Sequence, residues 1–382
     1  MTYSYSPARL RSLDVFRGIA IAGMLLVNQA GLVEQTYPQL RHADWHGWIW
    51  ADLVFPFFLF IVGAAMAFSL AKARTNRTPP LAIYGRICQR SALLFLLGLF
   101  LNGFWFYDLR TLRVMGILQR ISLTYLLAAL VVLKVPRKGQ WAITVVLLGG
   151  YWLALAFLPV PDFGVGQLTR TGNFGAYVDR LVLGTAHLYA GDQFHSMGDP
   201  EGLFSTLPAI STVLLGYFTG DWLRQRVSGL KIKTSRQSFI LTFYGLISLG
   251  LGLLWNFWFP INKKLWTSSY VLFSVGISLI LLAACYELIE VRRISRWSKP
   301  FEVLGLNAIT IFVASVLGIK ILVLTPIGSR DQPVNLFAWL FENLFLTWTS
   351  AEFGSLVFAL LTLCFWWIVA YSLYRQQWFV KI

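Results

Sequence analysis

Charged residues are scarce in this sequence of 382 residues. Asp, Glu, Lys and Arg make up 13% of it, whereas 57% of the residues are hydrophobic and 16% are aromatic. A soluble domain carries about 25% charged residues, so a soluble protein does not fit this composition. The balance is typical of a chain that crosses a membrane several times.

Cysteine is also rare. Cys88, Cys285 and Cys364 each lie inside an apolar run, with no second cysteine at CxxC spacing. This pattern supports neither a disulfide framework nor a zinc site, and no metal is expected. The sequence also lacks HExxH, P-loop and GxSxG motifs and any Cys–His pair, so the enzyme classes built on those motifs are not indicated.

Acidic residues are fewer than basic ones. The sequence has 17 Asp and Glu and 32 Lys and Arg, which gives a formal net charge of +15. Such an excess can indicate nucleic-acid binding, but these Lys and Arg lie in short segments between apolar runs, and no nucleic-acid partner is expected. Most of them fall in alternate segments, which the positive-inside rule assigns to the cytoplasm. Both termini are therefore predicted to be cytoplasmic.

Ten apolar segments are long enough to cross a bilayer core of about 30 Å, which takes roughly 20 helical residues. The expected fold is an all-α polytopic membrane helix bundle that forms a single domain over residues 1–382. The first run is predicted to be a retained span, because the N-terminus lacks the basic region of a signal peptide. The predicted spans are residues 14–33, 51–72, 88–107, 114–134, 140–159, 205–223, 237–258, 267–290, 300–324 and 352–374.

Two segments between the spans stand out. Residues 159–205 form a long loop on the extracytoplasmic side, and the aromatic and apolar content of residues 177–189 predicts that it is ordered and packed. Residues 334–348 are apolar but carry Glu342 and Asn343 midway. That pattern predicts an interfacial or re-entrant helix rather than a further span.

Titratable residues crowd together just before the second predicted span. His42, Asp44, His46 and Asp52 lie there, on the side of the membrane where all four histidines are predicted. Neutral imidazole is a competent general base near neutral pH. From spacing alone, His42 is either a catalytic base or a hydrogen-bonded histidine at the membrane interface.

Polar residues inside the predicted spans are further candidates, because they are costly to bury in a bilayer. Asn28 lies near the outer end of the first span. Arg120 lies one to two turns into the fourth span and should need an anionic partner, for which Asp52 is the candidate. A buried ion pair with a purely structural role is the alternative.

Charged residues near the span ends are harder to assign. Asp14 and Arg17 are three residues apart at the start of the first span and can share a helix face. On the extracytoplasmic side, residues 262–270 hold two adjacent lysines against the positive-inside trend. Such a placement suggests a task, such as holding an anionic or polyhydroxylated ligand, with snorkelling at the interface as the alternative.

Several motifs in succession resemble one family. They are RLRSLDVFRGIA (9–20), LVN (26–28), HADWHG (42–47), ADLVFPFFLFIVG (51–63), GILQR (116–120), DPEGLFSTLP (199–208), NKKLWTSSY (262–270) and GLNA (305–308). In this order they resemble the heparan-α-glucosaminide N-acetyltransferase family of transmembrane acyltransferases. The resemblance covers essentially the whole chain.

The resemblance implies that acetyl-CoA donates its acetyl group from the cytoplasmic side to the amino group of a terminal glucosamine on the other side. It implies that His42 is the catalytic histidine and that Asn28 lies beside it. The lysosomal enzyme has an extra N-terminal luminal region and a further span, both missing here, which suggests a bacterial inner-membrane member with His42 facing the periplasm. His46 stands where asparagine is expected, which leaves the acceptor's identity open.

The predicted activity is acetyl-CoA-dependent N-acetyl transfer, in which His42 takes the amine proton while Asn28 and Arg120 donate to the oxyanion. An acetyl-histidine intermediate is the alternative mechanism. The rival functions are a transporter or flippase of a sugar conjugate and an O-acyltransferase acting on an envelope glycan. The oligomeric state stays open, with a homodimer as one option. By role, the candidate residues are His42 and Asn28 for catalysis, Arg120 and Asp52 for support, His46, Asp44, Asp199, Glu201, Lys264 and Trp266 for the acceptor, and Arg86, Arg90, Asp14 and Arg17 for CoA.

Overall fold

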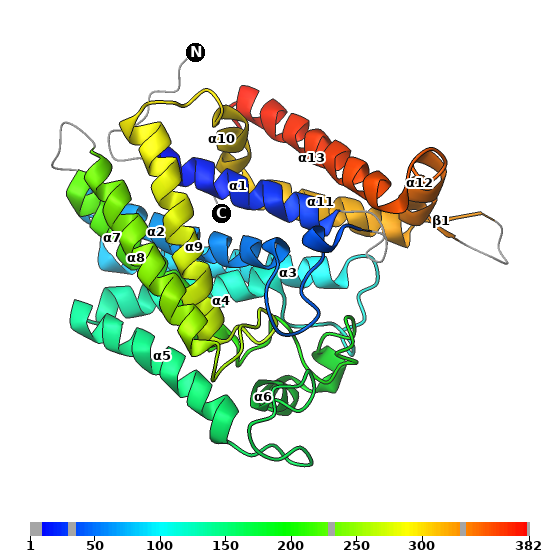
Figure 1. The fold of residues 1–382 in the computed structure, drawn as a ribbon, viewed down its shortest axis with the longest axis horizontal. Helices are drawn as coiled ribbons and strands as arrows, with labels where there is room; N and C mark the ends of the chain where they lie inside the picture. Colours follow the sequence, from blue (N-terminus) through cyan, green and yellow to red (C-terminus); the bar gives the residue numbers. More distant parts are fainter. Residues whose placement is uncertain (1–9, 30–35, 228–233, 329–333, 380–382) are drawn as a thin grey trace.

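The protein is predominantly helical. The computed structural model describes residues 10–29, 36–227, 234–328 and 334–379 (Figure 1). Two short strands, β1 (Pro326–Ile327) and β2 (Val334–Asn335), pair antiparallel. The helices are α1 (Arg11–Asn28), α2 (Trp50–Thr75), α3 (Pro80–Gly103), α4 (Ile117–Lys134), α5 (Arg137–Phe157), α6 (Phe174–Leu183), α7 (Thr206–Val227), α8 (Ser235–Trp255), α9 (Ser268–Tyr286), α10 (Lys299–Leu306), α11 (Ala308–Leu324), α12 (Leu336–Leu344) and α13 (Ala351–Arg375), with 3-10 turns η2 (Pro38–Leu40) and η3 (Thr185–His187) and the π-helical segment η4 (Glu287–Val291).

Each of the ten predicted spans coincides with a helix or a helix pair, which confirms the all-α class. The end of the first span, residues 30–33, lies outside the described residues. Within the described ranges, seven helices are long and apolar enough to cross a membrane, or eight if the bent pair of α10 and α11 is one span. α1 and α7 are not among them, and α1 carries Arg11, Asp14 and Arg17. The helix positions are therefore confirmed, whereas ten as the number of spans stays a prediction.

The ninth predicted span, residues 300–324, is not one continuous helix. α10 and α11 meet at Asn307 and are bent by 80°. Asn307 has a non-helical backbone (φ −119°, ψ 33°), and its side-chain amide donates to the carbonyl of Trp378 at 3.1 Å. Asparagine is a poor helix former because its side chain competes with the backbone for hydrogen bonds. The break could not be predicted from the sequence, because the residues around Asn307 form one continuous apolar run.

The two segments singled out between the spans have their own secondary structure. α12 has nine residues, which at 1.5 Å per residue covers about 13 Å and falls well short of a bilayer core. The α5–α7 loop, residues 159–205, contains α6 and η3. Asn173 caps α6 by accepting a hydrogen bond from the backbone of Ala176 at 2.8 Å. The loop therefore contains helical structure of its own.

α2 lies at the centre of the bundle. Its most apolar stretch is 83% buried, against 11% for α13, which lies along one edge (red in Figure 1). α2 and α7 pack closely because glycines on each helix lie against the backbone of the other. A Cβ added to Gly63 would lie 1.9 Å from the carbonyl oxygen of Val213, and one added to Gly216 would lie 2.1 Å from that of Phe60. Small residues allow such close contact between membrane helices, and here they fix the position of α2.

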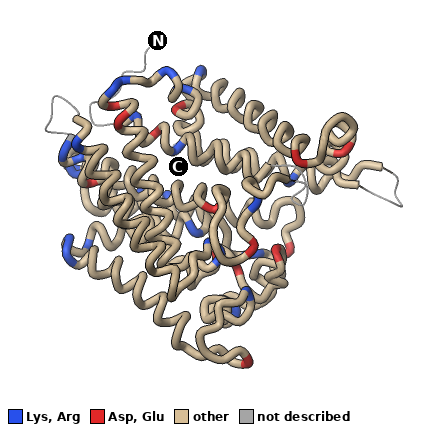
Figure 2. Tube along the Cα trace, viewed as in Figure 1, with Lys and Arg blue, Asp and Glu red and all other residues tan. Residues whose placement is uncertain are grey.

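Charge is distributed unevenly over the two ends of the bundle. Figure 2 shows Lys and Arg gathered at the left, where α5 begins and α7 ends, whereas residues of both signs mix around the α5–α7 loop. The mixed end is also where α1 ends and where α2, α4 and α9 begin. Segments distant in the sequence therefore bring titratable residues together there.

Candidate active site

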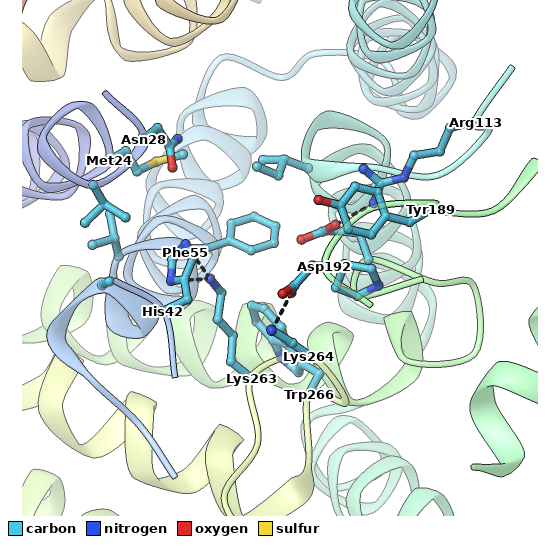
Figure 3. Close-up of a pocket in the computed structure, with 16 residues that line it drawn as sticks. Met24, Asn28, His42, Phe55, Arg113, Tyr189, Asp192, Lys263, Lys264 and Trp266 are labelled. Carbon is cyan, nitrogen blue, oxygen red and sulfur yellow. Dashed lines mark hydrogen bonds and ion pairs between the residues drawn. The ribbon is translucent and has the colours of Figure 1, made fainter. Parts of the chain in front are cut away.

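A cavity of about 250 Å³ lies at this mixed-charge end of the bundle (Figure 3). Its wall combines the last residue of α1, the first turn of α2, the α5–α7 loop and the turn before α9. Asn28 and His42 both line it, as the resemblance led us to expect. The other charged or titratable side chains in its wall are Arg113, Tyr189, Asp192, Glu201, Lys263 and Lys264.

Asp52 holds His42 in place. The Asp52 side chain is 1% exposed, and its Oδ1 is 2.9 Å from His42 Nδ1. Its Oδ2 accepts from the backbone N–H groups of Ala43 at 3.1 Å and Ile49 at 2.9 Å. An acidic residue is favourable in the first turn of a helix, because it accepts hydrogen bonds from the free N–H groups there and lies at the positive end of the helix dipole. Because an ionised carboxylate only accepts hydrogen bonds, Nδ1 carries the proton and Nε2 keeps its lone pair.

Lys263 lies directly beside this pair. Its Nζ is 3.0 Å from Nδ1 and 3.2 Å from Nε2 of His42, and 3.6 Å from Oδ1 of Asp52. The pKa of His42 is lowered, mainly by burial and next by the charge of Lys263. The hydrogen bond to Asp52 acts in the opposite direction but is weaker. A neutral imidazole is therefore favoured at neutral pH. The sequence analysis did not include Lys263 among the candidates, although the adjacent lysines against the charge trend were a signal for it.

The turn that presents Lys263 is tightly built. Asn262 accepts from the backbone of Leu265 at 2.9 Å, and its own N–H donates to Thr267 Oγ1 at 3.0 Å. Trp266 has a left-handed backbone with φ +52°, which non-glycine residues rarely adopt and which clusters at functional sites. The Trp266 ring is 1% exposed and forms part of the cavity wall.

Arg113 organises the opposite wall. Its guanidinium donates to both oxygens of Asp199, at 2.8 and 2.6 Å, and to Glu201 at 2.7 Å. It also stacks over Tyr189, 4.3 Å from the ring centre. Burial would raise the pKa of Glu201, but the charges of Arg113, Arg120 and Lys263 together outweigh it and leave that pKa lowered. Glu201 lines the cavity, whereas Asp199 is buried and does not. Arg113 was not among the residues that the sequence singled out.

Lys264 lines a third side of the cavity. Its ammonium forms an ion pair with Asp192 and donates to the backbone carbonyl of Asp44 at 2.8 Å. The carboxylate of Asp44 is 79% exposed and pairs with Arg170 at 2.7 Å. His46 lines a neighbouring pocket of about 290 Å³, which Arg170 also lines. Asp44 and His46 therefore lie next to the His42 cavity and not in its wall.

The expected pairing of Arg120 with Asp52 is wrong. Arg120 is fully buried, and it donates to Ser205 Oγ and, at 3.3 Å, to the carbonyl of Gly202. Its guanidinium stacks 5.0 Å from the ring of Trp266, and its Nε and Nη1 have no hydrogen-bond partner among the described residues. Asp52 is engaged by His42, so Arg120 instead anchors the segment that carries Glu201.

The four candidates for CoA binding do not meet in one place. Arg86 and Arg90 line a second pocket, of about 340 Å³, between α2 and α3. Asp14 and Arg17 pair with each other at 3.0 Å on α1 and do not line that pocket. Over the described ranges, His, Cys, Asp and Glu form no group of three or more that could hold a metal ion.

Comparisons with known proteins point to one family. The family model described as heparan-alpha-glucosaminide N-acetyltransferase, catalytic, matches residues 9–257. The human heparan-alpha-glucosaminide N-acetyltransferase is 30% identical over 433 residues, which cover 98% of this chain and 60% of the human protein. The mouse protein of the same name is 30% identical over 431 residues, which cover 99% of this chain and 61% of the mouse protein. The chain thus spans about three fifths of the length of these curated relatives. It belongs to the heparan-alpha-glucosaminide N-acetyltransferase family.

Proposed function

We propose that this protein transfers the acetyl group of acetyl-CoA to the amino group of an amino sugar such as a terminal glucosamine. The names of the family and of its curated members support this reaction class. The observation that carries the proposal is that His42, hydrogen-bonded to the buried Asp52, lines a cavity. An amine acceptor needs a base beside it, and this pair supplies one.

His42 acts as the general base. As the acceptor nitrogen attacks the thioester carbonyl carbon, His42 Nε2 takes the amine proton. The N–C bond forms, the C–S bond breaks, and the proton passes from Nε2 to the departing CoA thiolate. Asp52 keeps the ring in the required tautomer and stabilises the transient imidazolium. In the alternative two-step route, the same Nε2 attacks first and carries the acetyl group.

Asn28 is the proposed donor to the tetrahedral oxyanion, because its amide lines the cavity that His42 lines (Figure 3). A donor fixed in place before the reaction stabilises the developing charge without reorganisation. Arg120 is held behind Trp266 and outside the cavity wall. Its proposed role is therefore to position the Glu201 segment rather than to touch the oxyanion.

The acceptor is proposed to bind against Glu201, Lys264 and Trp266. A sugar presents hydroxyl groups to charged side chains and a less polar face to an aromatic ring, and the cavity wall offers both kinds of surface. Its volume of about 250 Å³ is below the roughly 300–1,000 Å³ of drug-sized sites. A single terminal sugar unit is the size of acceptor that this space favours.

The donor nucleotide is proposed to bind at Arg86 and Arg90, because CoA phosphates need cations and these two arginines share a pocket. The concentration of Lys and Arg at the far end of the bundle (Figure 2) supports a cytoplasmic location for that end. His42 would then face the other side, which is the periplasm if the chain resides in a bacterial inner membrane.

The test compares two sugars that differ only at the amine. Purified protein is incubated with acetyl-labelled acetyl-CoA and either glucosamine or N-acetylglucosamine, whose amine is already blocked, and products are identified by mass spectrometry. We expect label on the amine of glucosamine and none on N-acetylglucosamine. Equal labelling of both sugars would indicate O-acylation, and movement of a sugar conjugate across liposomes without thioester loss would indicate a transporter. Either result contradicts the proposal.

A further inference from the structure

The amine of Lys263 lies beside the base that is proposed to activate the acceptor amine. In the proposed function, on which this inference rests, the acceptor nitrogen must lie within hydrogen-bond distance of His42 Nε2. Lys263 Nζ lies 3.2 Å from that atom and 3.0 Å from Nδ1, in the same cavity. Its side chain is 17% exposed, so it is open to the cavity. In Figure 3 its ammonium meets the His42 ring from the side of the cavity.

We infer that Lys263 is an internal acceptor, and that in the absence of an amino sugar the protein transfers an acetyl group from acetyl-CoA to its own Lys263. The geometry that lets His42 activate a sugar amine lets it activate this lysine as well. The sugar amine and the Lys263 amine would both lie beside His42. A thioester that can reach one of them can therefore also reach the other.

The step balances without any further reactant. The neutral Nζ attacks the thioester carbonyl carbon, so that the N–C bond forms and the C–S bond breaks. The Nζ proton moves to His42 Nε2 and from there to the CoA thiolate, which leaves as the free thiol. The products are one acetamide on Lys263 and one CoA, and His42 returns to its neutral form.

The surroundings of Lys263 shift its amine toward the neutral form that can attack a thioester. Burial lowers the pKa of Lys263, and the positive charge of Lys264 lowers it further. The negative charges of Asp52 and Glu201 oppose this shift. Lys264, in the same turn, has different partners, because its ammonium pairs with Asp192 and donates to a backbone carbonyl, whereas Lys263 lies 3.6 Å from Asp52 and beside the His42 ring. Adjacent lysines therefore stand in different settings, and only Lys263 faces the base.

Acetylation would change the site in two ways. It would remove the positive charge beside His42, and it would leave an acetamide where the acceptor amine must bind. Both effects oppose the transfer to sugar, so protein charged with acetyl-CoA alone should lose transferase activity in proportion to the acetylated fraction of Lys263. A free amino sugar competes for the same base and should protect the protein.

The test follows acetyl label on peptides of the full-length protein. Detergent-purified protein is incubated with labelled acetyl-CoA, with or without saturating glucosamine, and fragment spectra distinguish Lys263 from Lys264. We expect label on Lys263 approaching one acetyl group per chain without glucosamine, and little with it. His42→Ala should slow the labelling about 100-fold or more, and Lys263→Arg should abolish it. The glucosamine comparison uses the wild type alone and so does not depend on how well a variant folds.

Two outcomes would overturn the inference in different ways. Label on Lys263 and Lys264 at equal rates, unaffected by glucosamine, would reveal uncatalysed acetylation. Glucosamine-dependent CoA release with no label on Lys263 would refute self-acetylation and leave the proposed function standing. If neither CoA release nor label is seen with folded protein, the proposed function fails and the inference fails with it.

Discussion

Replacing Asp52 with asparagine tests the pairing on which the proposed catalysis depends. Oδ2 of Asp52 accepts two backbone N–H groups, whereas Oδ1 faces His42 Nδ1. An asparagine in this position keeps its oxygen on the two backbone donors and turns its NH₂ group toward Nδ1. Because an amide nitrogen only donates, Nδ1 must then accept, and the proton moves to Nε2.

In that tautomer the atom that should remove the amine proton has no lone pair. Loss of a general base, or its confinement to the wrong tautomer, costs about 10²- to 10⁴-fold in kcat. The Asp52 side chain is 1% exposed and does not line the cavity, so the KM for glucosamine should change little. The expected result is a large fall in kcat at a nearly constant KM.

CoA release measured against glucosamine concentration supplies both constants. The matched control is Asp108→Asn, since Asp108 pairs with Arg110 at 3.0 Å on a loop outside the cavity wall, and this variant should behave as the wild type. Thermal unfolding in detergent shows whether each variant is folded. A folded Asp52→Asn protein whose kcat stays within about threefold of the wild type would refute the general-base reasoning.

Three further predictions follow from other parts of the structure. Lys263→Met removes a cation that helps to lower the pKa of His42, so the acidic limb of kcat/KM against pH should move to higher pH; an unmoved limb would show that Lys263 does not act on His42. Burial raises the pKa of Asp179 from 3.8 to about 7, so the folded protein holds a proton that the unfolded chain has lost, and stability falls as pH rises between these values. The Tm advantage of Asp179→Asn over the wild type should therefore be larger at about pH 8 than at about pH 5, and an advantage that does not change with pH would contradict the shift. Gly216→Ala should cost about 1–3 kcal/mol or more by forcing α2 from α7, whereas Gly150→Ala, where an added Cβ meets nothing within 4 Å, should be tolerated; equal stabilities would argue against the close crossing.

The helices could be predicted from the sequence because apolar runs of bilayer length leave the backbone few alternatives. All ten predicted positions carry helices for this reason. The break at Asn307 could not be predicted, because one polar residue in an apolar run neither lowers the mean hydropathy much nor signals an 80° bend. Which helices form the centre was also not predictable, since α2 and α13 are similarly apolar but 83% and 11% buried.

The site was only partly predictable. The crowding of His42 and Asp52 before an apolar run was visible in the sequence, but their mutual hydrogen bond was not. The predicted pair of Asp52 and Arg120 rested only on their similar depth in the membrane. In the structure Asp52 is hydrogen-bonded to His42. Arg120 instead donates to the carbonyl of Gly202 and the hydroxyl of Ser205. The depth of a residue in the membrane does not determine which neighbouring helix its side chain contacts.

Arg113 was not singled out from the sequence, and Lys263 was noted there only as one of two adjacent lysines. Arg113 and Lys263 lie in short segments between apolar runs, where Lys and Arg are usually explained by topology. Their roles become visible only through contacts with residues far along the chain, namely Asp199 for Arg113 and His42 for Lys263. A charge placed against the topological trend is the one sequence signal that could have identified them.

The most direct test of the account is CoA release from acetyl-CoA by the purified protein with and without glucosamine, compared between the wild type and His42→Ala. The account predicts glucosamine-dependent release by the wild type and a loss of about 100-fold or more in the variant. Equal release by both proteins would contradict the role of His42. Absence of release from folded wild-type protein across a panel of amino sugars would contradict the proposed acetyl transfer itself.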